Sequence, residues 1–410
     1  VDNTTVNYTR SEKLYGLTPT STVYFLQGYG ENQYEVKFGN GIAGLPLSDG
    51  NIVSITYRDC NATEANGATL FKNINNIQKT SNAGYYNIIS AATTTVAFNG
   101  AERETIDSIK FNAPKYFAAQ DRAVVNDDYL TLIKTKFPQI QAASIYGGET
   151  LIPPQYGYVA ISLKPHDAYV APIVLKNEIS AYIMDKIPVP IKPIFIDPSY
   201  YYLQVNSTVY FDQNKTTNTP YDIQTMVINT IQNYNDNYLF DFQLDFRYSK
   251  LVSLIDATDP SIVSNDTTVK MTKRIFPTIN TSYSTVIDFN QSLKLEGHPV
   301  GYYPVVESSA FAYQAADTLV YSAILTDDGY GVLNVYTNEA VGIRRVLNAG
   351  VGTVDYTTGV VTIQGLYIYS FTNYINITID TAIKDIIIGK NQILTIDPVD
   401  VTVNVTQVLM

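Results

Sequence analysis

The stretch from Asn126 to Leu163 constrains the fold of this chain more than any other. Asn126 is a favourable N-cap for a helix, and Pro138 ends that helix. Residues 140–146 then have the composition of a strand, and residues 158–163 alternate apolar with polar side chains. A helix followed by two strands around a Gly-Gly turn predicts a small sheet with a helix packed on it.

The same alternation of helices and strands continues to about residue 278. The pattern predicts helices that begin at Pro172 and Pro220, a short helix at 251–255, a strand pair at 194–196 and 201–211, and a strand at 269–275. Strands and helices that alternate over this length favour a sheet with helices on one face.

Both ends of the chain are expected to be mainly β. Near the N-terminus the best strands are 23–26, 34–38 and 52–57, and a polar stretch at 80–104 marks a boundary. Beyond residue 280 the predicted strands are 354–356, 360–363, 375–379 and 399–405. This last region is expected to be β-sandwich-like, with one solvated face on its outer strands.

The sequence therefore predicts a β-rich α+β protein of several domains. A central α+β region at 104–279 is flanked by a mainly-β N-terminal domain at 1–103 and a β-sandwich-like C-terminal domain at 280–410. A length of 410 residues is enough for two to four domains with cores of their own.

Composition excludes several classes of protein. The net charge of −11 opposes nucleic-acid binding, which needs a basic surface. Cys60 is the only cysteine, so no internal disulfide can form, which suits a reducing compartment such as the cytoplasm. No apolar run is long enough to span a membrane. The 34 tyrosines suit protein contacts, although tyrosine also simply favours strands.

Searches for catalytic, cofactor or metal sites give nothing convincing. Gly39, Gly41 and Gly44 match G-x-G-x-x-G, but Leu45-Pro46 follows instead of a helix, so a turn between strands is the better interpretation. The only histidines, His166 and His298, lie beside prolines and lack partners at metal-binding spacing. Asp327-Asp328-Gly329 predicts a β-turn rather than a calcium loop. We expect no cofactor, no metal and no catalysis.

An ordered set of residues between 104 and 165 then becomes recognisable. It has the form E-T-I-x-x-I, A-P, F-x-x-Q-x-R-A-V-x-x-x-D-Y, P-x-I, Y-G-G-E, P-P and G-x-V-x-I-x-L-x-P. The set resembles the baseplate J-like family, which comprises wedge subunits of contractile phage tails and related injection machines. The resemblance is greatest to the large wedge subunits of T4-like phages. The glycine motif at residues 39–44 and the segment 351–359 also resemble these subunits.

The resemblance assigns structural importance to twelve positions of the motif. They are Gly39, Gly41, Gly44, Glu104, Pro114, Gln120, Arg122, Asp128, Tyr129, Gly147, Gly148 and Glu149. Members of the family are longer at the N-terminus, and this chain starts at Val1 without a methionine, so we expect a C-terminal fragment.

The resemblance also implies the partners. Copies would form dimers and an inner ring around the baseplate hub, contact other wedge proteins and the hub and sheath-initiator proteins, and rearrange when the sheath contracts. We expect residues 1–100 and 280–410 to carry these contacts. Two alternatives stay open: a carbohydrate-binding host-adhesion module, which needs exposed aromatic side chains in a groove, and a polysaccharide-degrading enzyme, which needs paired carboxylates in a cleft.

Overall fold

The computed structural model describes residues 5–30, 33–57, 61–70, 77–78, 85–86, 97, 100, 102–166, 168–295, 304–315, 318–340 and 343–408. Cys60 and His298 lie outside these residues, as does most of the predicted boundary at 80–104. The chain divides into two compact units, Val1–Asn61 and Ala62–Met410. Strands outnumber helices among the described elements, which confirms a β-rich α+β chain.

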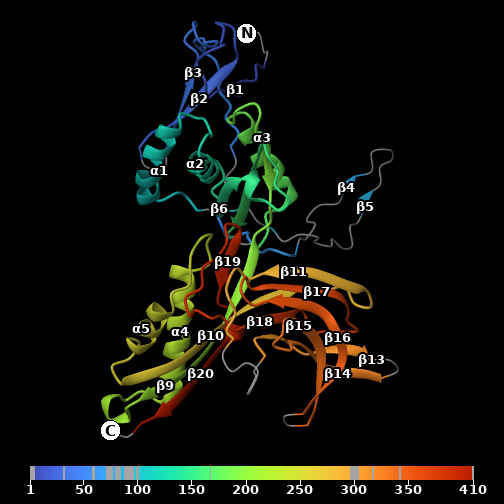
Figure 1. Cartoon of the computed structure of the whole chain (residues 1–410). Helices are drawn as coiled ribbons and strands as arrows, with labels where there is room; N and C mark the ends of the chain where they lie inside the picture. Colours follow the sequence, from blue (N-terminus) through green and yellow to red (C-terminus); the bar gives the residue numbers. More distant parts are fainter. Residues whose placement is uncertain are drawn as a thin grey trace. The chain divides into compact units, whose positions relative to one another are not determined.

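The first unit contains a three-stranded sheet of β1 (Thr9–Arg10), β2 (Val23–Gly28) and β3 (Tyr34–Phe38) (Figure 1). β2 and β3 form an antiparallel hairpin, and β1 lies parallel to β2. The strands predicted at 23–26 and 34–38 are confirmed, but the strand predicted at 52–57 is wrong. Its β-branched residues have strand propensity, yet no described strand pairs with them and they are exposed.

The second unit begins with elements that the patterns did not predict. Two short strands, β4 (Ile77–Gln78) and β5 (Tyr85–Tyr86), pair with each other. Helix α1 (Ile106–Ala119) follows, although Pro114 lies inside it, where proline usually interrupts a helix. The Thr105 hydroxyl accepts a hydrogen bond from the Ser108 N–H and caps the helix.

A small α/β layer comes next, and we call it the three-stranded subdomain. Its elements are α2 (Asn126–Lys136), β6 (Ile140–Gly147), the 3-10 turn η1 (Gly148–Thr150), β7 (Tyr158–Pro165), α3 (Ile173–Met184) and β8 (Lys192–Phe195). The predicted helices and the two strands around the glycines are confirmed. β7 pairs antiparallel with β6 and parallel with β8, and side chains of α2 and α3 form one core with the sheet.

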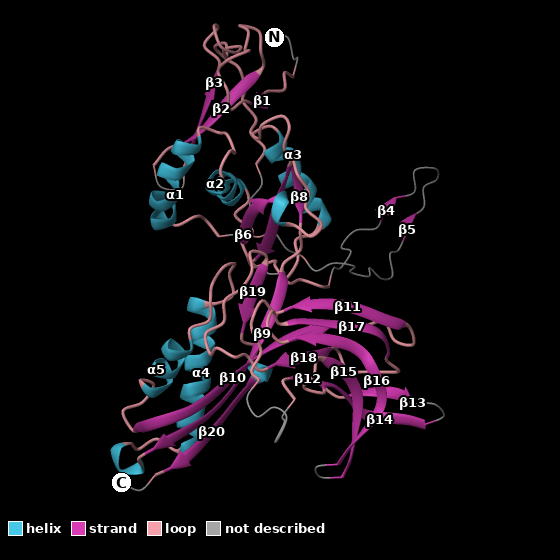
Figure 2. Cartoon of the chain, in the orientation of Figure 1, coloured by secondary structure: helices cyan, strands magenta, loops and turns pink. Residues whose placement is uncertain are grey.

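The chain then enters a twelve-stranded sheet through β9 (Ser199–Phe211). The predicted pairing of 194–196 with 201–211 is therefore wrong, because β8 and β9 belong to different sheets. Helices α4 (Pro220–Tyr238) and α5 (Tyr248–Asp256) follow, and then β10 (Ile262–Ile275) pairs with β9. Figure 2 shows both helices beside the end of the sheet that holds β9 and β10.

The remaining strands extend this sheet. They are β11 (Ser282–Asp288), β12 (Val306–Ser308), β13 (Phe311–Ala315), β14 (Thr318–Asp327), β15 (Val332–Ala340), β16 (Ile343–Asp355), β17 (Val360–Tyr367), β18 (Ile375–Ile379), β19 (Gln392–Thr395) and β20 (Val401–Gln407). The main path runs β11-β17-β16-β15-β14-β12-β18-β10-β9-β19. The final strand begins two residues later than predicted, at Val401 instead of Val399, because Val399 lies in the 3-10 turn η3 (Pro398–Asp400).

One large hydrophobic core joins the early and late strands of this sheet. It includes side chains of β9, α4, α5 and β10 together with side chains of β14 to β18 and β20. β19 and β20 both return to lie parallel with β9, so the end of the chain packs beside residues 199–211. The sheet thus contains strands from both sides of residue 280. The division of the chain into domains at 103/104 and 279/280 stays a prediction.

Candidate functional site

Side chains that could support catalysis are sparse in the described part of the chain. No group of three or more His, Cys, Asp or Glu residues there is placed to hold a metal ion. His166 is exposed at the end of β7, and its backbone N–H donates to the Gln139 carbonyl. No helix among the described residues is long and apolar enough to cross a bilayer.

Asp327 and Asp328 lie where β14 ends, and both bind backbone N–H groups, Asp327 those at the start of β12 and Asp328 those of the β14–β15 turn. Asp327 is buried, and its Oδ1 accepts hydrogen bonds from the Val305 and Val306 N–H groups at 2.9 Å. Its Oδ2 accepts the Tyr356 hydroxyl at 2.7 Å, and burial together with this carboxylate raises the pKa of Tyr356. Asp328 accepts the Tyr330 N–H within the turn. The predicted turn is present, and these contacts give the aspartates a structural role.

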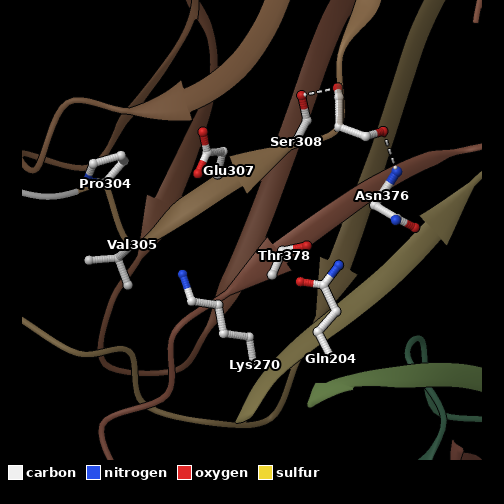
Figure 3. A pocket seen from close by; sticks show the side chains of 9 residues that line it. Gln204, Lys270, Pro304, Val305, Glu307, Ser308, Asn376 and Thr378 are labelled. Carbon is white, nitrogen blue, oxygen red and sulfur yellow. Dashed lines mark hydrogen bonds between the residues drawn. The ribbon is translucent and has the colours of Figure 1, made fainter. Parts of the chain in front are cut away.

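One polar pocket opens on the large sheet, with a volume of about 210 Å³. It is lined by Gln204, Lys270, Pro304, Val305, Glu307, Ser308, Ser309, Asn376 and Thr378. Figure 3 shows their side chains gathered from several neighbouring strands. No aromatic side chain among the described residues lines the pocket, so their arrangement does not favour a sugar-binding groove. Glu307 is the only carboxylate among the described lining residues, which therefore do not form the acid pair of a glycosidase.

The three motif glycines of the first unit shape one tight connection after β3. Gly41 and Gly44 have positive φ values of 83° and 92°. A Cβ on Gly39 would collide with the backbone of Gly44, so the two glycines allow the chain to fold closely on itself. No helix follows them among residues 39–57, which leaves this motif without the helix that a dinucleotide site needs.

Four motif residues surround α1. Glu104 accepts hydrogen bonds from the side chains of Ser108 and Asn112, and so supports the first turns of the helix. Pro114 lies within the helix, and Gln120 ends it with a left-handed φ of 50°. Arg122 is exposed, and its backbone N–H donates to the Ala119 carbonyl.

Asp128 and Tyr129 fix the start of α2. Asn126 is the first residue of the helix and not the N-cap as predicted. Val125 takes the N-cap position, which is held by the carboxylate of Asp128. Its Oδ2 accepts the Val124 and Val125 N–H groups, each at 3.0 Å. Tyr129 is buried in the core of the three-stranded subdomain, and burial raises the pKa of its hydroxyl.

The Gly-Gly-Glu motif joins β6 to a proline-containing loop. The Gly148 carbonyl accepts the Gln155 N–H at 2.8 Å, and a Cβ on Gly148 would collide with the carbonyl oxygen of Gln155. Only glycine therefore lets the loop approach this closely. Glu149 is exposed, and its carboxylate lies next to Gly147. The twelve motif residues do not converge on one site. Nine support α1 and the three-stranded subdomain, and three shape the first unit.

The most unusual surface lies on α1 and escaped prediction. The four residues that we call the α1 stripe are exposed: Ile106 (71 %), Ile109 (47 %), Tyr116 (40 %) and Phe117 (76 %). Their spacing places them on one side of the helix, while Ser108, Asn112 and Ala119 on a neighbouring side are more buried. The sequence contains two signals for α1, the spacing of its apolar residues and the Thr105 cap. Pro114 argues against a helix in the same segment.

A second apolar surface is formed by two loops that contain prolines. Ile152 and Val189 are 99 % and 98 % exposed, and Tyr156 is also exposed. The Lys192 N–H donates to the Gly157 carbonyl at 3.0 Å and joins the bases of the two loops. Prolines restrict these loops before any partner binds, which reduces the entropy lost on association. We call this surface the proline loops.

A buried ionic cluster holds the returning C-terminal segment to the large sheet. The Arg274 guanidinium lies 2.8 Å from both Asp397 and Asp400 and is stacked between the rings of Tyr202 and Tyr374. The side chains of Arg274 and Asp400 are only 9 % and 7 % exposed. Burial raises the pKa of Asp400, and the Arg274 charge opposes that rise. The cluster joins β10, β9 and η3.

A small junction connects the three-stranded subdomain to the large sheet. Ala142 of β6 forms a separate core with Phe242 and Ile393. The Lys164 ammonium lies 3.6 Å from the centre of the Phe240 ring and donates to Gln141. Burial lowers the pKa of Lys164 to about 8. Because only three buried apolar residues form this core, the junction is much smaller than the cores on either side of it.

Comparisons with known proteins identify relatives of this chain. Residues 125–196 match the family "Baseplate structural protein gp6, C-terminal domain I", and residues 199–274 match "Baseplate structural protein gp6, C-terminal domain III". The baseplate wedge protein gp6 of Enterobacteria phage T4 is 24 % identical over 375 residues. The match covers 86 % of this chain and 54 % of the T4 protein, so the chain spans about half the length of this relative.

Among solved structures, the chain is similar to part of the cryo-EM structure of the anti-feeding prophage baseplate, 6-fold symmetrised. The two are 14 % identical, with 45 % of this chain and 41 % of the other covered and a TM-score of 0.29. A score this low does not establish a common fold. The sequence comparisons therefore carry the relationship, and the chain is similar to gp6 baseplate wedge proteins over most of its length.

Proposed function

We propose that this chain is a structural subunit of the baseplate wedge of a contractile phage tail, located in the tail baseplate of the virion. The observation that carries the proposal is the similarity to a baseplate wedge protein over 86 % of the chain. The two gp6 domain families match adjacent segments, which correspond to the three-stranded subdomain and to the start of the large sheet. Membership of the baseplate J-like family is part of the same proposal.

The proposed partners are further copies of the chain, arranged as dimers in a ring around the hub, other wedge proteins, and the hub and sheath-initiator proteins. The α1 stripe and the proline loops support this part of the proposal, because isolated proteins rarely leave such apolar clusters in water. They lie within 104–279, so we extend the proposed contacts beyond the outer regions 1–100 and 280–410. Assembly takes place in the host cytoplasm, where a chain with one cysteine needs no oxidising compartment.

The role is proposed to be mechanical rather than catalytic. The described lining of the polar pocket offers one carboxylate and one lysine without a paired acid and base. The junction between the three-stranded subdomain and the large sheet supports movement on sheath contraction. Large cores on both sides favour rigid bodies, and the three-residue core between them is where a rearrangement costs least.

The test measures assembly with the other wedge proteins of the same virus. Phe117→Glu places a charge in the α1 stripe and is expected to weaken wedge assembly at least about tenfold, because a buried unpaired charge costs more than 1.4 kcal/mol. Phe111→Glu is the matched control. Phe111 is a similarly exposed aromatic residue on the opposite side of the same helix.

Light scattering of the wild-type chain over a wide concentration range completes the test. A discrete dimer together with specific capture of wedge proteins would support the proposal. A chain that stays monomeric and captures no wedge protein would refute it. Equal effects of the two phenylalanine substitutions would remove the α1 stripe from the proposed contacts.

A further inference from the structure

The outer edge of β3 is unpaired among the described strands, and the first unit buries little by itself. β2 is the only described strand that pairs with β3. Among residues 5–30 and 33–57, Gly44 is the only buried residue, so the sheet has no enclosed core. An open strand next to so little buried surface is a template for pairing with another chain. Tyr34, at the start of β3, is exposed.

The hydrogen-bond pattern of the β2–β3 hairpin shows which backbone groups are available at this edge. The Tyr29 N–H donates to the Gln33 carbonyl, so the backbone groups of Gln33 point toward β2. We call such a position inward, and a position whose backbone groups point toward the open edge outward. Inward and outward positions alternate in an antiparallel ladder, so Glu35 and Lys37 direct their backbone groups toward β2. Tyr34, Val36 and Phe38 therefore direct their N–H and C=O groups toward the open edge.

This pattern permits only a few registers between two copies of β3 in antiparallel pairing. Outward positions must lie opposite outward positions, so Val36 can face Val36, Tyr34 or Phe38 of the second copy. If Val36 faces Tyr34, Glu35 faces Glu35. If Val36 faces Phe38, Lys37 faces Lys37. Both shifted registers place like charges directly opposite each other, which destabilises strand pairing.

The central register alone matches the charges. With Val36 opposite Val36 of the second copy, each Glu35 lies opposite a Lys37, and each Tyr34 lies opposite a Phe38. Opposite charges and aromatic pairs across strands are both stabilising, and all five residues of β3 are paired. The two side chains are already near each other within one chain, where Lys37 Nζ lies 3.3 Å from Glu35 Oε2.

We propose that two copies of this chain associate through their β3 strands, paired antiparallel about a twofold axis at Val36. Such a contact is isologous, because each copy presents the same strand to the other. The inference rests on the proposed self-association and assigns one surface to it. A second copy is the partner that fits best, since the sequence of β3 is complementary to itself in the one register that brings no like charges together. Two chains that each carry a net charge of −11 need such local compensation.

Charge reversal tests the register directly. Glu35→Lys and Lys37→Glu each place like charges opposite each other twice in the homodimer, and each should weaken dimerisation about tenfold. An equimolar mixture of the two variants restores opposite charges in the mixed dimer and should recover the wild-type affinity. The double variant Glu35→Lys/Lys37→Glu should recover it as well. Asp49→Lys, which changes the net charge outside β3, should leave affinity unchanged. Dissociation constants come from light scattering of the full chain.

Each outcome decides a different point. Weakened single variants together with recovery in the mixture support the proposed register. A wild-type dimer that tolerates both reversals, or weakened variants that do not recover on mixing, overturns β3 pairing while self-association stands. A wild-type chain that is monomeric at every concentration overturns both β3 pairing and the self-association proposed above.

Discussion

Replacement of Arg274 by methionine is the sharpest test of how the C-terminal segment is held. Methionine keeps much of the apolar stem, but it removes the guanidinium that lies over the rings of Tyr202 and Tyr374, and the charge with it. Asp400 then remains buried with no cationic partner in the cluster. Because β20 follows Asp400 directly, the substitution strains the attachment of the last strand to the sheet.

The expected magnitude follows from the geometry. Each ion pair at 2.8 Å has a gross attraction of about 6 kcal/mol at an effective dielectric constant of about 20, and desolvation offsets much of it. Removal of one partner from a buried pair costs about 3–5 kcal/mol, since the remaining charge stays desolvated. We therefore expect Arg274→Met to lower the free energy of unfolding by about 3–5 kcal/mol at pH 7.

Equilibrium unfolding in guanidinium chloride, followed by circular dichroism, measures this loss. The double variant Arg274→Met/Asp400→Asn is the control, because it removes the buried charge as well and should recover at least about half of the loss. The loss should also shrink as pH falls from 7 to 5. Without Arg274, the folded-state pKa of Asp400 lies further above its unfolded value, and protonation then favours the folded state. A loss below about 1 kcal/mol, or a double variant no more stable than Arg274→Met, would refute the reasoning.

Three further predictions concern stability. Asp128→Ala should lower the free energy of unfolding by about 1 kcal/mol through loss of the α2 cap, and Asp127→Ala, which lacks those contacts, should cost less. Gly148→Ala should cost about 2 kcal/mol in the same unfolding assay, because the new Cβ meets backbone oxygen rather than a movable side chain. Burial lowers the pKa of Lys273 to about 8 from the unfolded value of 10.5, so the unfolded state binds more protons between these values. Stability should therefore rise with pH above 8, and Lys273→Met should flatten that rise in a pH series of denaturation midpoints.

Local sequence signals determined several elements of this protein by themselves. Thr219, Pro220 and Asp222 define the start of α4, where the capping box forms as a helix of that sequence requires. Alternation of apolar and polar residues likewise identified β7 and β18, since successive side chains of a strand point to opposite faces. Buried and half-buried side chains alternate in β18, whereas most of β7 is buried on both faces. The motif between residues 104 and 165 pointed to baseplate wedge proteins before any geometry was considered, and the comparisons support that direction.

Only the tertiary structure decided which elements belong together. Nothing local separates β8 from β9, yet they join different sheets, because strand pairing depends on residues far away in the sequence. Helix α1 forms despite Pro114, and its apolar stripe faces outward, which spacing alone cannot reveal. Arg274 meets Asp397, Asp400 and two tyrosines only because β19 and β20 return beside β9. Caps and periodicity are properties of neighbouring residues and can be inferred from sequence, whereas pairing, burial and exposure are fixed by the whole fold.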